Sequence, residues 1–193
     1  CVIADKIALL ADPVFVKPDL FHGFPMVISI LCFTVQIYCD FSGYSDIAIG
    51  SARTLGIDLM RNFNVPYISK SIDEFWHRWH ISLSTWFRDY LYIPLGGNRV
   101  SKTRRYLNVF IVFLVSGLWH GANWTFVIWG ALHGSFIILA LWRNKLFPTL
   151  KLPNFLQWLT TFFLVAMAWT FFRANNIYDA FYILQHTLSG ILQ

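Results

Sequence analysis

The chain has 193 residues, of which 56% are hydrophobic, 19% aromatic and 13% charged, and its formal net charge is +5. Soluble domains carry about 25% charged residues, so a water-soluble domain of this size could not bury so much apolar surface. This composition excludes a soluble globular protein and predicts an integral membrane protein. The basic residues are scattered between apolar segments, which is typical of loops that set membrane orientation and argues against nucleic-acid binding.

The three cysteines are Cys1, Cys32 and Cys39. Because Cys32 and Cys39 are seven residues apart and share a helix face, buried free thiols are favoured over a disulfide framework. The chain starts at Cys1 and stops within a helical pattern. We therefore expect residues 1–193 to form one partial domain that lacks N-terminal membrane spans and a C-terminal end.

The first long apolar segment, Leu20–Cys39, contains no Asp, Glu, Lys or Arg, and Pro25 fits the first turn of a helix. Twenty helical residues span about 30 Å, which is one bilayer core. Asp40 and Asp46 follow among small residues that permit close helix packing. A carboxylate at membrane depth normally faces a partner or a cavity. We favour an interfacial position for Asp46 and leave both alternatives open for Asp40.

Residues 71–99 are dense in Trp, His and Arg between uncharged segments. On one continuous helix, an aromatic face would hold Trp76, Trp79, Leu83, Trp86, Phe87 and Tyr90, beside a polar stripe of Asp73, His77, His80, Ser84 and Arg88. We predict one long amphipathic or re-entrant helix, capped by Ser71 with Glu74 as capping-box partner and ending before Pro94. It either lines a wet cavity or lies at the membrane interface with its polar side in water.

The longest uncharged run, Tyr106–Trp142, would reach about 56 Å as one helix, nearly twice a bilayer core. We expect it to break at Gly121-Ala122-Asn123 into a two-arm hairpin whose basic ends lie on the cytoplasmic side. The first arm is only about 22 Å long, which would leave His120 partway into the membrane. With a further uncharged run at 152–172 and apolar residues at helical spacing over 177–193, the chain should have about four membrane-crossing helices.

His120 stands out chemically because it lies between Gly117 and Gly121 in an apolar run. A neutral imidazole can accept a proton from a hydroxyl near neutral pH, as general-base catalysis requires. A buried histidine bonded to a carbonyl is the alternative, and both remain open. His133 has the same two interpretations, with the structural one favoured. His77 and His80 share a face, but few carboxylates lie nearby and no metal site is expected.

Three segments carry a resemblance to a known family: CDFSGYSDIAIG, NFNVPYISKSIDEFWHRWHISLSTWFRDYLYIPLGGNR and SGLWHGANWTFVIWGALHG. They resemble the core of the membrane-bound O-acyltransferase (MBOAT) family, and in particular its bacterial alginate O-acetyltransferase branch. Relatives that D-alanylate teichoic acids form a second branch. The resemblance implies an all-α, polytopic membrane enzyme.

The same resemblance implies roles for particular residues. His120 matches the family's catalytic histidine and would act as general base, while His80 matches a second functional position that would place the substrate or polarise the acyl carbonyl. Residues expected to line or support the substrate tunnel are Arg78, Trp79, Ser84, Arg88, Trp119 and Asn123.

The implied reaction is O-acyl transfer, most simply of acetyl, to hydroxyls of an exported or cell-envelope polysaccharide such as alginate. The donor would be an acyl thioester or an acyl carrier, without a metal or prosthetic group. A multi-pass position in a bacterial inner membrane and separate periplasmic acetylation proteins are also implied. The alternatives are D-alanyl transfer to teichoic acid, a transporter or channel segment, and a non-enzymatic scaffold.

Overall fold

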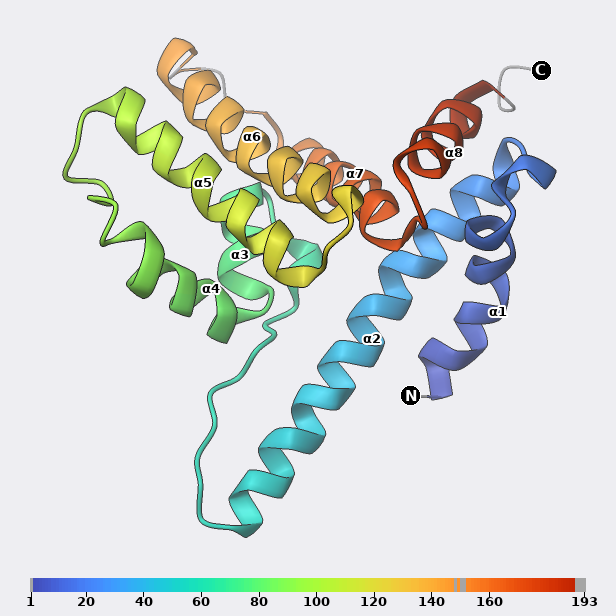
Figure 1. Cartoon of the computed structure of the whole chain (residues 1–193), viewed down its shortest axis with the longest axis horizontal. Helices are drawn as coiled ribbons and strands as arrows, with labels where there is room; N and C mark the ends of the chain where they lie inside the picture. The colour runs from blue at the N-terminus through green and yellow to red at the C-terminus, as the bar shows by residue number, and fades with distance from the viewer. Residues whose placement is uncertain (1, 148, 150–151, 190–193) are drawn as a thin grey trace. The chain divides into compact units, whose positions relative to one another are not determined.

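The computed structural model describes residues 2–147, 149 and 152–189 (Figure 1). Within them the chain is helical and contains no strand, which confirms the all-α, polytopic membrane class. In chain order the elements are α1 (Val2–Val16), the 3₁₀ helix η1 (Pro18–Leu20), α2 (Phe24–Thr54), the 3₁₀ helix η2 (Pro66–Ile68), α3 (Ile72–Arg78), α4 (Ile81–Phe87), the π-helix η3 (Arg88–Tyr92), α5 (Lys102–His120), α6 (Trp124–Leu146), α7 (Asn154–Arg173) and α8 (Ile177–Ser189).

Three of the described helices, α2, α6 and α7, are long and apolar enough to cross a membrane. The sequence predicted about four crossings. Of the apolar segments that it offered, α8 is not among the three, and neither is α5. Its first turn carries Lys102, Arg104 and Arg105, which leaves an uncharged length of about 22 Å. The helix α2 starts at Phe24, one residue before the predicted Pro25, which lies in its first turn, and it runs on past Asp40 and Asp46.

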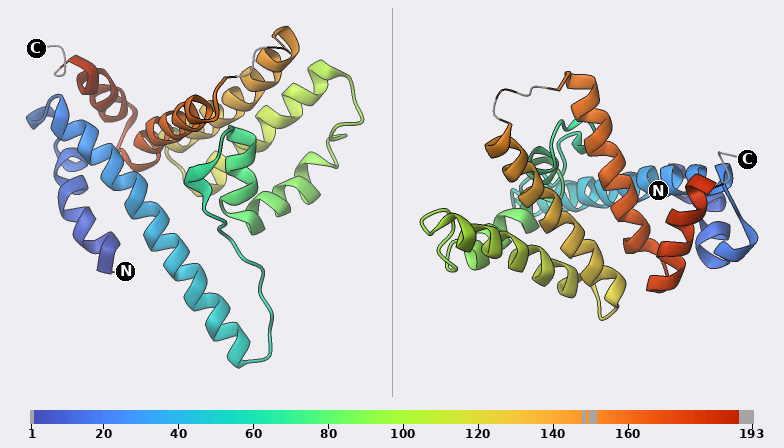
Figure 2. Two further views of the ribbon diagram at one scale, coloured as in Figure 1. Left: turned by 180° about the vertical axis from the view of Figure 1, so that it is seen from behind. Right: turned by 90° about the horizontal axis from the view of Figure 1, so that it is seen from above.

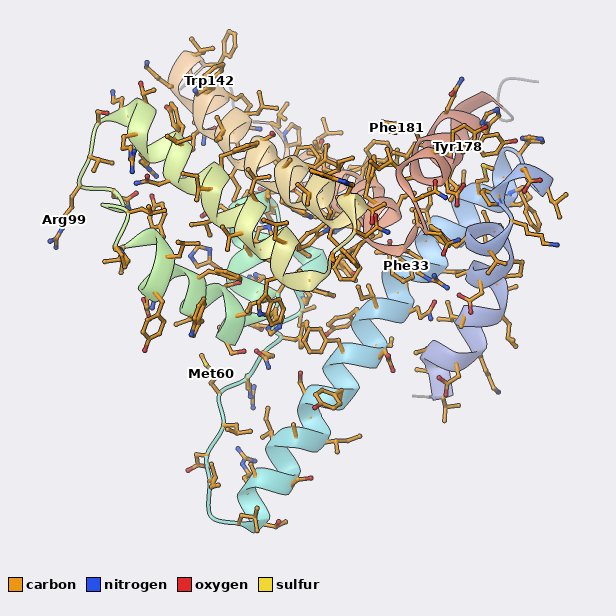
Figure 3. The ribbon with its side chains drawn as sticks, in the orientation of Figure 1. Phe33, Met60, Arg99, Trp142, Tyr178 and Phe181 are labelled. Atoms are coloured by element: carbon orange, nitrogen blue, oxygen red, sulfur yellow. The ribbon has the colours of Figure 1, made fainter. Side chains whose placement is uncertain are left out.

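The chain divides into two compact units, and the first comprises residues 1–60 with 166–193. Here α1 packs along α2: the Ser29 hydroxyl donates to the Ala11 carbonyl at 2.8 Å, and Phe33, labelled in Figure 3, lies with its ring centroid 5.6 Å from that of Phe15. Arg173, the last residue of α7, forms an ion pair of 2.7 Å with Asp12. Cys32 and Cys39 are free thiols on α2, as predicted, but both are partly exposed rather than buried.

The second unit, residues 61–165, is built around an antiparallel hairpin of α5 and α6, whose two arms lie side by side in Figures 1 and 2. The predicted break at residues 121–123 is confirmed, because α5 ends at His120 and Asn123 caps α6 by accepting from the Thr125 N–H at 3.1 Å. At the opposite end of the hairpin, the rings of Tyr106 and Trp142 meet at 6.2 Å.

Two glycines allow the arms of this hairpin to approach closely. A Cβ atom added at Gly117 would collide with the Phe126 carbonyl oxygen, and one added at Gly130 would collide with the Phe113 carbonyl oxygen. The neighbour in each case is rigid helix backbone rather than a flexible side chain. The α5–α6 contact therefore requires glycine at both positions.

Replacing Gly130 by Ala should destabilise the protein by about 1–3 kcal/mol, because the helices must separate to accommodate the methyl group. Gly50→Ala on α2 is the matched control, since nothing lies within 4 Å of its added Cβ. Thermal unfolding of the detergent-solubilised whole protein measures both. Equal melting temperatures for the two variants would contradict the close packing.

The predicted single helix over residues 71–93 is wrong, because the segment consists of α3, α4 and η3 with a break at Trp79 and His80. His80 has left-handed backbone angles, φ 44° and ψ 55°, which a regular helix cannot contain. After the break the predicted aromatic face is divided. Trp79 is buried in the unit, whereas Trp86 and Tyr90 are exposed.

The ends of this segment follow the sequence more closely. Ser71 caps α3 by accepting from the Glu74 N–H, as predicted, and the helical segment stops before Pro94. The Glu74 carboxylate, however, accepts from the N–H of Lys70 at 2.8 Å, one residue before the position that a capping box requires. Beyond the turn that follows, the side chain of Arg99 projects from the molecule (Figure 3).

Candidate active site

His80 and His120, which the sequence singled out, belong to different segments of the second unit but lie near enough to interact electrostatically. His80 precedes α4 and His120 ends α5, and both lie outside the three candidate membrane spans. Burial lowers the pKa of His80 to about 4. Burial also lowers the pKa of His120 to about 4, with a smaller contribution from charge on His80. Both imidazoles are therefore neutral at neutral pH, the form in which a histidine accepts a proton.

Aromatic rings fix the orientation of the His120 imidazole. The Trp129 ring meets it edge to face at 5.1 Å, and the Trp119 ring meets it at 4.9 Å. Trp129 is 1% exposed, whereas Trp119 is 59% exposed. A side chain at Gly121 would press on the ring of Phe126, which lies 6.4 Å from the His120 ring. The buried Trp129 ring thus supports the His120 imidazole on the side that faces the core of the unit.

Next to Trp129 lies a hydrogen-bonded pair, Trp76 and His133, that the sequence did not predict. The Trp76 Nε1–H donates to His133 Nδ1 at 3.2 Å, so His133 is a neutral imidazole with its proton on Nε2. His133 is fully buried, and its ring centroid lies 5.0 Å from that of Trp129. This geometry supports the structural interpretation of His133. No local pattern could have revealed it, since Trp76 and His133 are 57 residues apart.

Three of the predicted support residues hold the break between α3 and α4. Trp79 is 3% exposed and stacks on Phe75 at 5.5 Å, so it belongs to the core of the unit. The Ser84 hydroxyl donates to the Trp79 carbonyl at 3.3 Å, and the Ser84 N–H donates to the His80 carbonyl at 3.0 Å. These contacts fix the position of the His80 backbone, which carries the imidazole.

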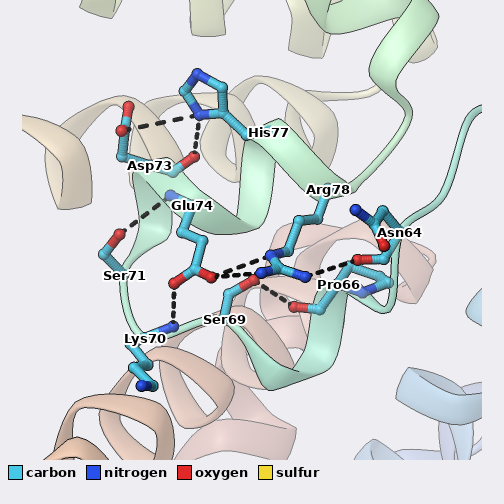
Figure 4. A network of polar contacts seen from close by, with 9 residues as sticks. All are labelled: Asn64, Pro66, Ser69, Lys70, Ser71, Asp73, Glu74, His77 and Arg78. Atoms are coloured by element: carbon cyan, nitrogen blue, oxygen red, sulfur yellow. Dashed lines mark hydrogen bonds and ion pairs between the residues drawn. The ribbon is translucent and has the colours of Figure 1, made fainter.

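Arg78 is the third residue at this break, and Figure 4 shows its contacts. Its guanidinium forms an ion pair of 2.9 Å with Glu74, and its Nη1 donates to the Asn64 carbonyl at 3.2 Å. The Glu74 carboxylate is in turn bonded to the Lys70 N–H. Arg78 thus ties α3 to the loop before it.

The remaining predicted site residues lie in separate places. Arg88 is bonded to its neighbour Asp89 at 2.7 Å on the exposed start of η3. Asn123 caps α6 three residues after His120. His77, to which the sequence assigned no chemistry, is exposed and bonded to the Asp73 carbonyl. Among the described residues, no group of three His, Cys, Asp or Glu side chains could hold a metal ion.

The depressed pKa of His80 predicts a stability that depends on pH. The unfolded state binds a proton near pH 6.5, whereas folded His80 resists it until about pH 4. Its contribution to stability is therefore complete above pH 6.5 and is lost as the pH falls to about 4. Melting temperatures of His80→Asn should fall less over this window than those of the parent. A parent-like pH profile for His80→Asn would contradict the prediction.

Comparison with known proteins shows the family to which the chain belongs. Residues 13–181 match the family model described as MBOAT, membrane-bound O-acyltransferase family. The chain belongs to this family. The match includes both histidines, the α3–α4 break and the α5–α6 hairpin, so the candidate site lies wholly within the MBOAT region.

Individual relatives cover most of this chain. It is 51% identical over 177 residues to a probable alginate O-acetylase, AlgI, of Pseudomonas aeruginosa, covering 91% of this chain and 33% of the relative. It is 46% identical over 188 residues to a peptidoglycan O-acetyltransferase of Helicobacter pylori, and the match covers 95% of this chain and 35% of the relative. A teichoic acid D-alanyltransferase of Streptococcus thermophilus is 38% identical over 118 residues, and the match covers 57% of this chain and 28% of the relative. The chain thus spans about a third of the length of these relatives.

Proposed function

We propose that the whole protein is a membrane O-acyltransferase that transfers acetyl groups to hydroxyls of an exported or cell-envelope polysaccharide. The observation that carries this proposal is a pair of neutral histidines, His80 and His120, that lie near enough to interact electrostatically although they belong to separate segments of an MBOAT chain. The relatives named as alginate and peptidoglycan O-acetylating enzymes, which match over 91% and 95% of this chain, support the acetyl group and the polysaccharide acceptor.

In the proposed reaction, the acceptor hydroxyl gives its proton to a ring nitrogen of His120, and the oxygen attacks the carbonyl carbon of the acyl donor. The new carbon–oxygen bond forms as the bond between the acyl carbon and the leaving atom of the donor breaks. His120 then passes the proton to that leaving atom, a sulfur if the donor is a thioester. A neutral His80 has one N–H to donate to the carbonyl oxygen as negative charge develops on it.

The environment of the reaction belongs to the same proposal. The apolar helices α2, α6 and α7 anchor the protein in a membrane, which we assign to the bacterial inner membrane. Membrane lipid would surround these helices. The donor would be an acyl thioester or acyl carrier, separate periplasmic acetylation proteins would act on the same polysaccharide, and no metal or prosthetic group is required by the chemistry above.

Deleting the gene for the whole protein and restoring it tests the function. Polysaccharide and cell-wall fractions are treated with mild alkali, and the released acetate and D-alanine are measured. Acetate that disappears on deletion and returns on restoration supports acetyl transfer. D-alanine that follows the gene instead would favour the alternative of teichoic acid D-alanylation. Unchanged ester content, with export lost or unaffected, would overturn the proposal in favour of a transporter or a scaffold.

A further inference from the structure

Asn62, in the loop before η2, forms hydrogen bonds with the two residues that follow His80. Its backbone carbonyl accepts from the Ile81 N–H at 3.0 Å. Its side-chain Oδ1 accepts from the Ser82 N–H at 3.1 Å and also from the Ser82 hydroxyl. One asparagine therefore satisfies the first backbone donors of α4, through both its main chain and its side chain.

The next residues of the same loop hold the other side of the break. The Asn64 N–H donates to the Arg78 carbonyl at 3.0 Å, and the Asn64 carbonyl accepts from the Arg78 guanidinium (Figure 4). Between them, the Phe63 ring meets the Trp79 ring edge to face at 5.0 Å. Residues 62–64 thus flank the break on both sides.

These bonds replace the helical bond that would otherwise cross the break. In a continuous helix the Ser82 N–H would donate to the carbonyl four residues earlier, that of Arg78. In the structure the Ser82 N–H donates to Asn62 and the Arg78 carbonyl accepts from Asn64. His80 can therefore take left-handed angles, which are strained for a residue other than glycine. A continuous helix would point the imidazole in another direction.

We propose that Asn62 is a positioning residue that acts through His80, holding the α3–α4 break so that the imidazole faces the reacting groups beside His120. This inference rests on the proposed function, because it assigns His80 a part in acyl transfer. The Asn62 side chain forms its hydrogen bonds with Ser82, two residues after His80. Its effect reaches the reaction only through the backbone of residues 80–82.

The test uses cells that produce the whole protein and compares Asn62→Ala, Asn62→Asp and Asn64→Ala. Asn62→Ala removes the Oδ1 acceptor, whereas Asn62→Asp keeps an oxygen at the same place. Asn64→Ala is the matched control, because Asn64 takes part through its backbone. Cells receive a pulse of radiolabelled acetate, and the initial rate of alkali-labile label entering the polysaccharide is divided by the amount of membrane-inserted protein.

A misplaced catalytic group can cost about a hundredfold in rate, so Asn62→Ala should lose about tenfold or more per protein molecule. Asn62→Asp should lie closer to the parent than to Asn62→Ala, and Asn64→Ala should keep the parent rate. The inference is overturned if Asn62→Ala loses less than about threefold, or if Asn62→Asp is no faster than Asn62→Ala.

A second set of variants separates this inference from the proposed function. In a His80→Asn background, Asn62→Ala should lose little further rate, because coupled residues are not additive. A further loss as large as in the parent would show that Asn62 does not act through His80 and would overturn the inference. His120→Ala reports on the proposed function independently. If His120→Ala keeps the parent rate, the assigned base is wrong, whatever the result at Asn62.

Discussion

Replacing His120 by Ala in the whole protein should lower acetyl transfer by about 100- to 10,000-fold while membrane insertion stays normal. The lower bound is the usual contribution of a positioned general base, and the upper bound is its largest common value. His120 lies at the end of α5, so the substitution removes a ring that Trp119 and Trp129 contact without altering the α5–α6 glycine contacts. The measurement is the rate of ester-linked acetyl formation per inserted protein molecule.

His77→Ala is the matched control for this substitution. His77 is also a histidine of the second unit, but it is exposed and bonded to the carbonyl of Asp73 in its own helix. Its loss should leave the rate within about twofold, as for most surface changes away from a site. Normal acetylation in His120→Ala, or an equal loss in both variants, would remove His120 from the chemistry.

Replacing Trp129 by Ala should cost about 3–5 kcal/mol of stability, the range typical of a buried Trp in a packed core. Trp129 is 1% exposed, and its ring contacts Trp76, His120 and His133. Its removal leaves a void beside the Trp76–His133 hydrogen bond and takes away the ring behind His120. The expected result is a large drop in the melting temperature of the detergent-solubilised protein.

Trp124→Ala on the same helix separates burial from residue type. Trp124 is 71% exposed, so its truncation should change the stability by less than about 1 kcal/mol. If the two variants have the same melting temperature, the ring cluster around Trp129 does not contribute to the stability of this unit. If only Trp129→Ala has a lowered melting temperature, the ring cluster is part of the core that packs against His120.

The sequence alone determined the class of the protein and several helix ends. A low charge content and long uncharged runs require a lipid environment, because no other arrangement hides so much apolar surface. Local chemistry also placed the start of α2 to within one residue of Pro25, and it placed the Ser71 cap and the break after His120. Each of these features depends on residues within a few positions, which is why they can be predicted without the tertiary structure.

The motif resemblance identified the family without the tertiary structure. It depends on the order of residues along the chain, and the family match over residues 13–181 confirms it. The roles of His80 and His120 stay predictions, and the structure adds that the two lie near enough to interact electrostatically. Arg78, Trp79 and Ser84 were predicted as site residues from that resemblance, and the structure places them at the break before α4.

Only the tertiary structure decided how the segment from Ser71 to Pro94 is shaped. Its helical periodicity predicted one helix, since nothing local forbids a bond from the Ser82 N–H to the Arg78 carbonyl. Asn62 and Asn64, far back in the chain, take those two groups instead. Likewise, the bond between Trp76 and His133 joins residues 57 positions apart. Sequence patterns report local preferences, and hydrogen bonds between distant segments overrule them where packing brings a better partner.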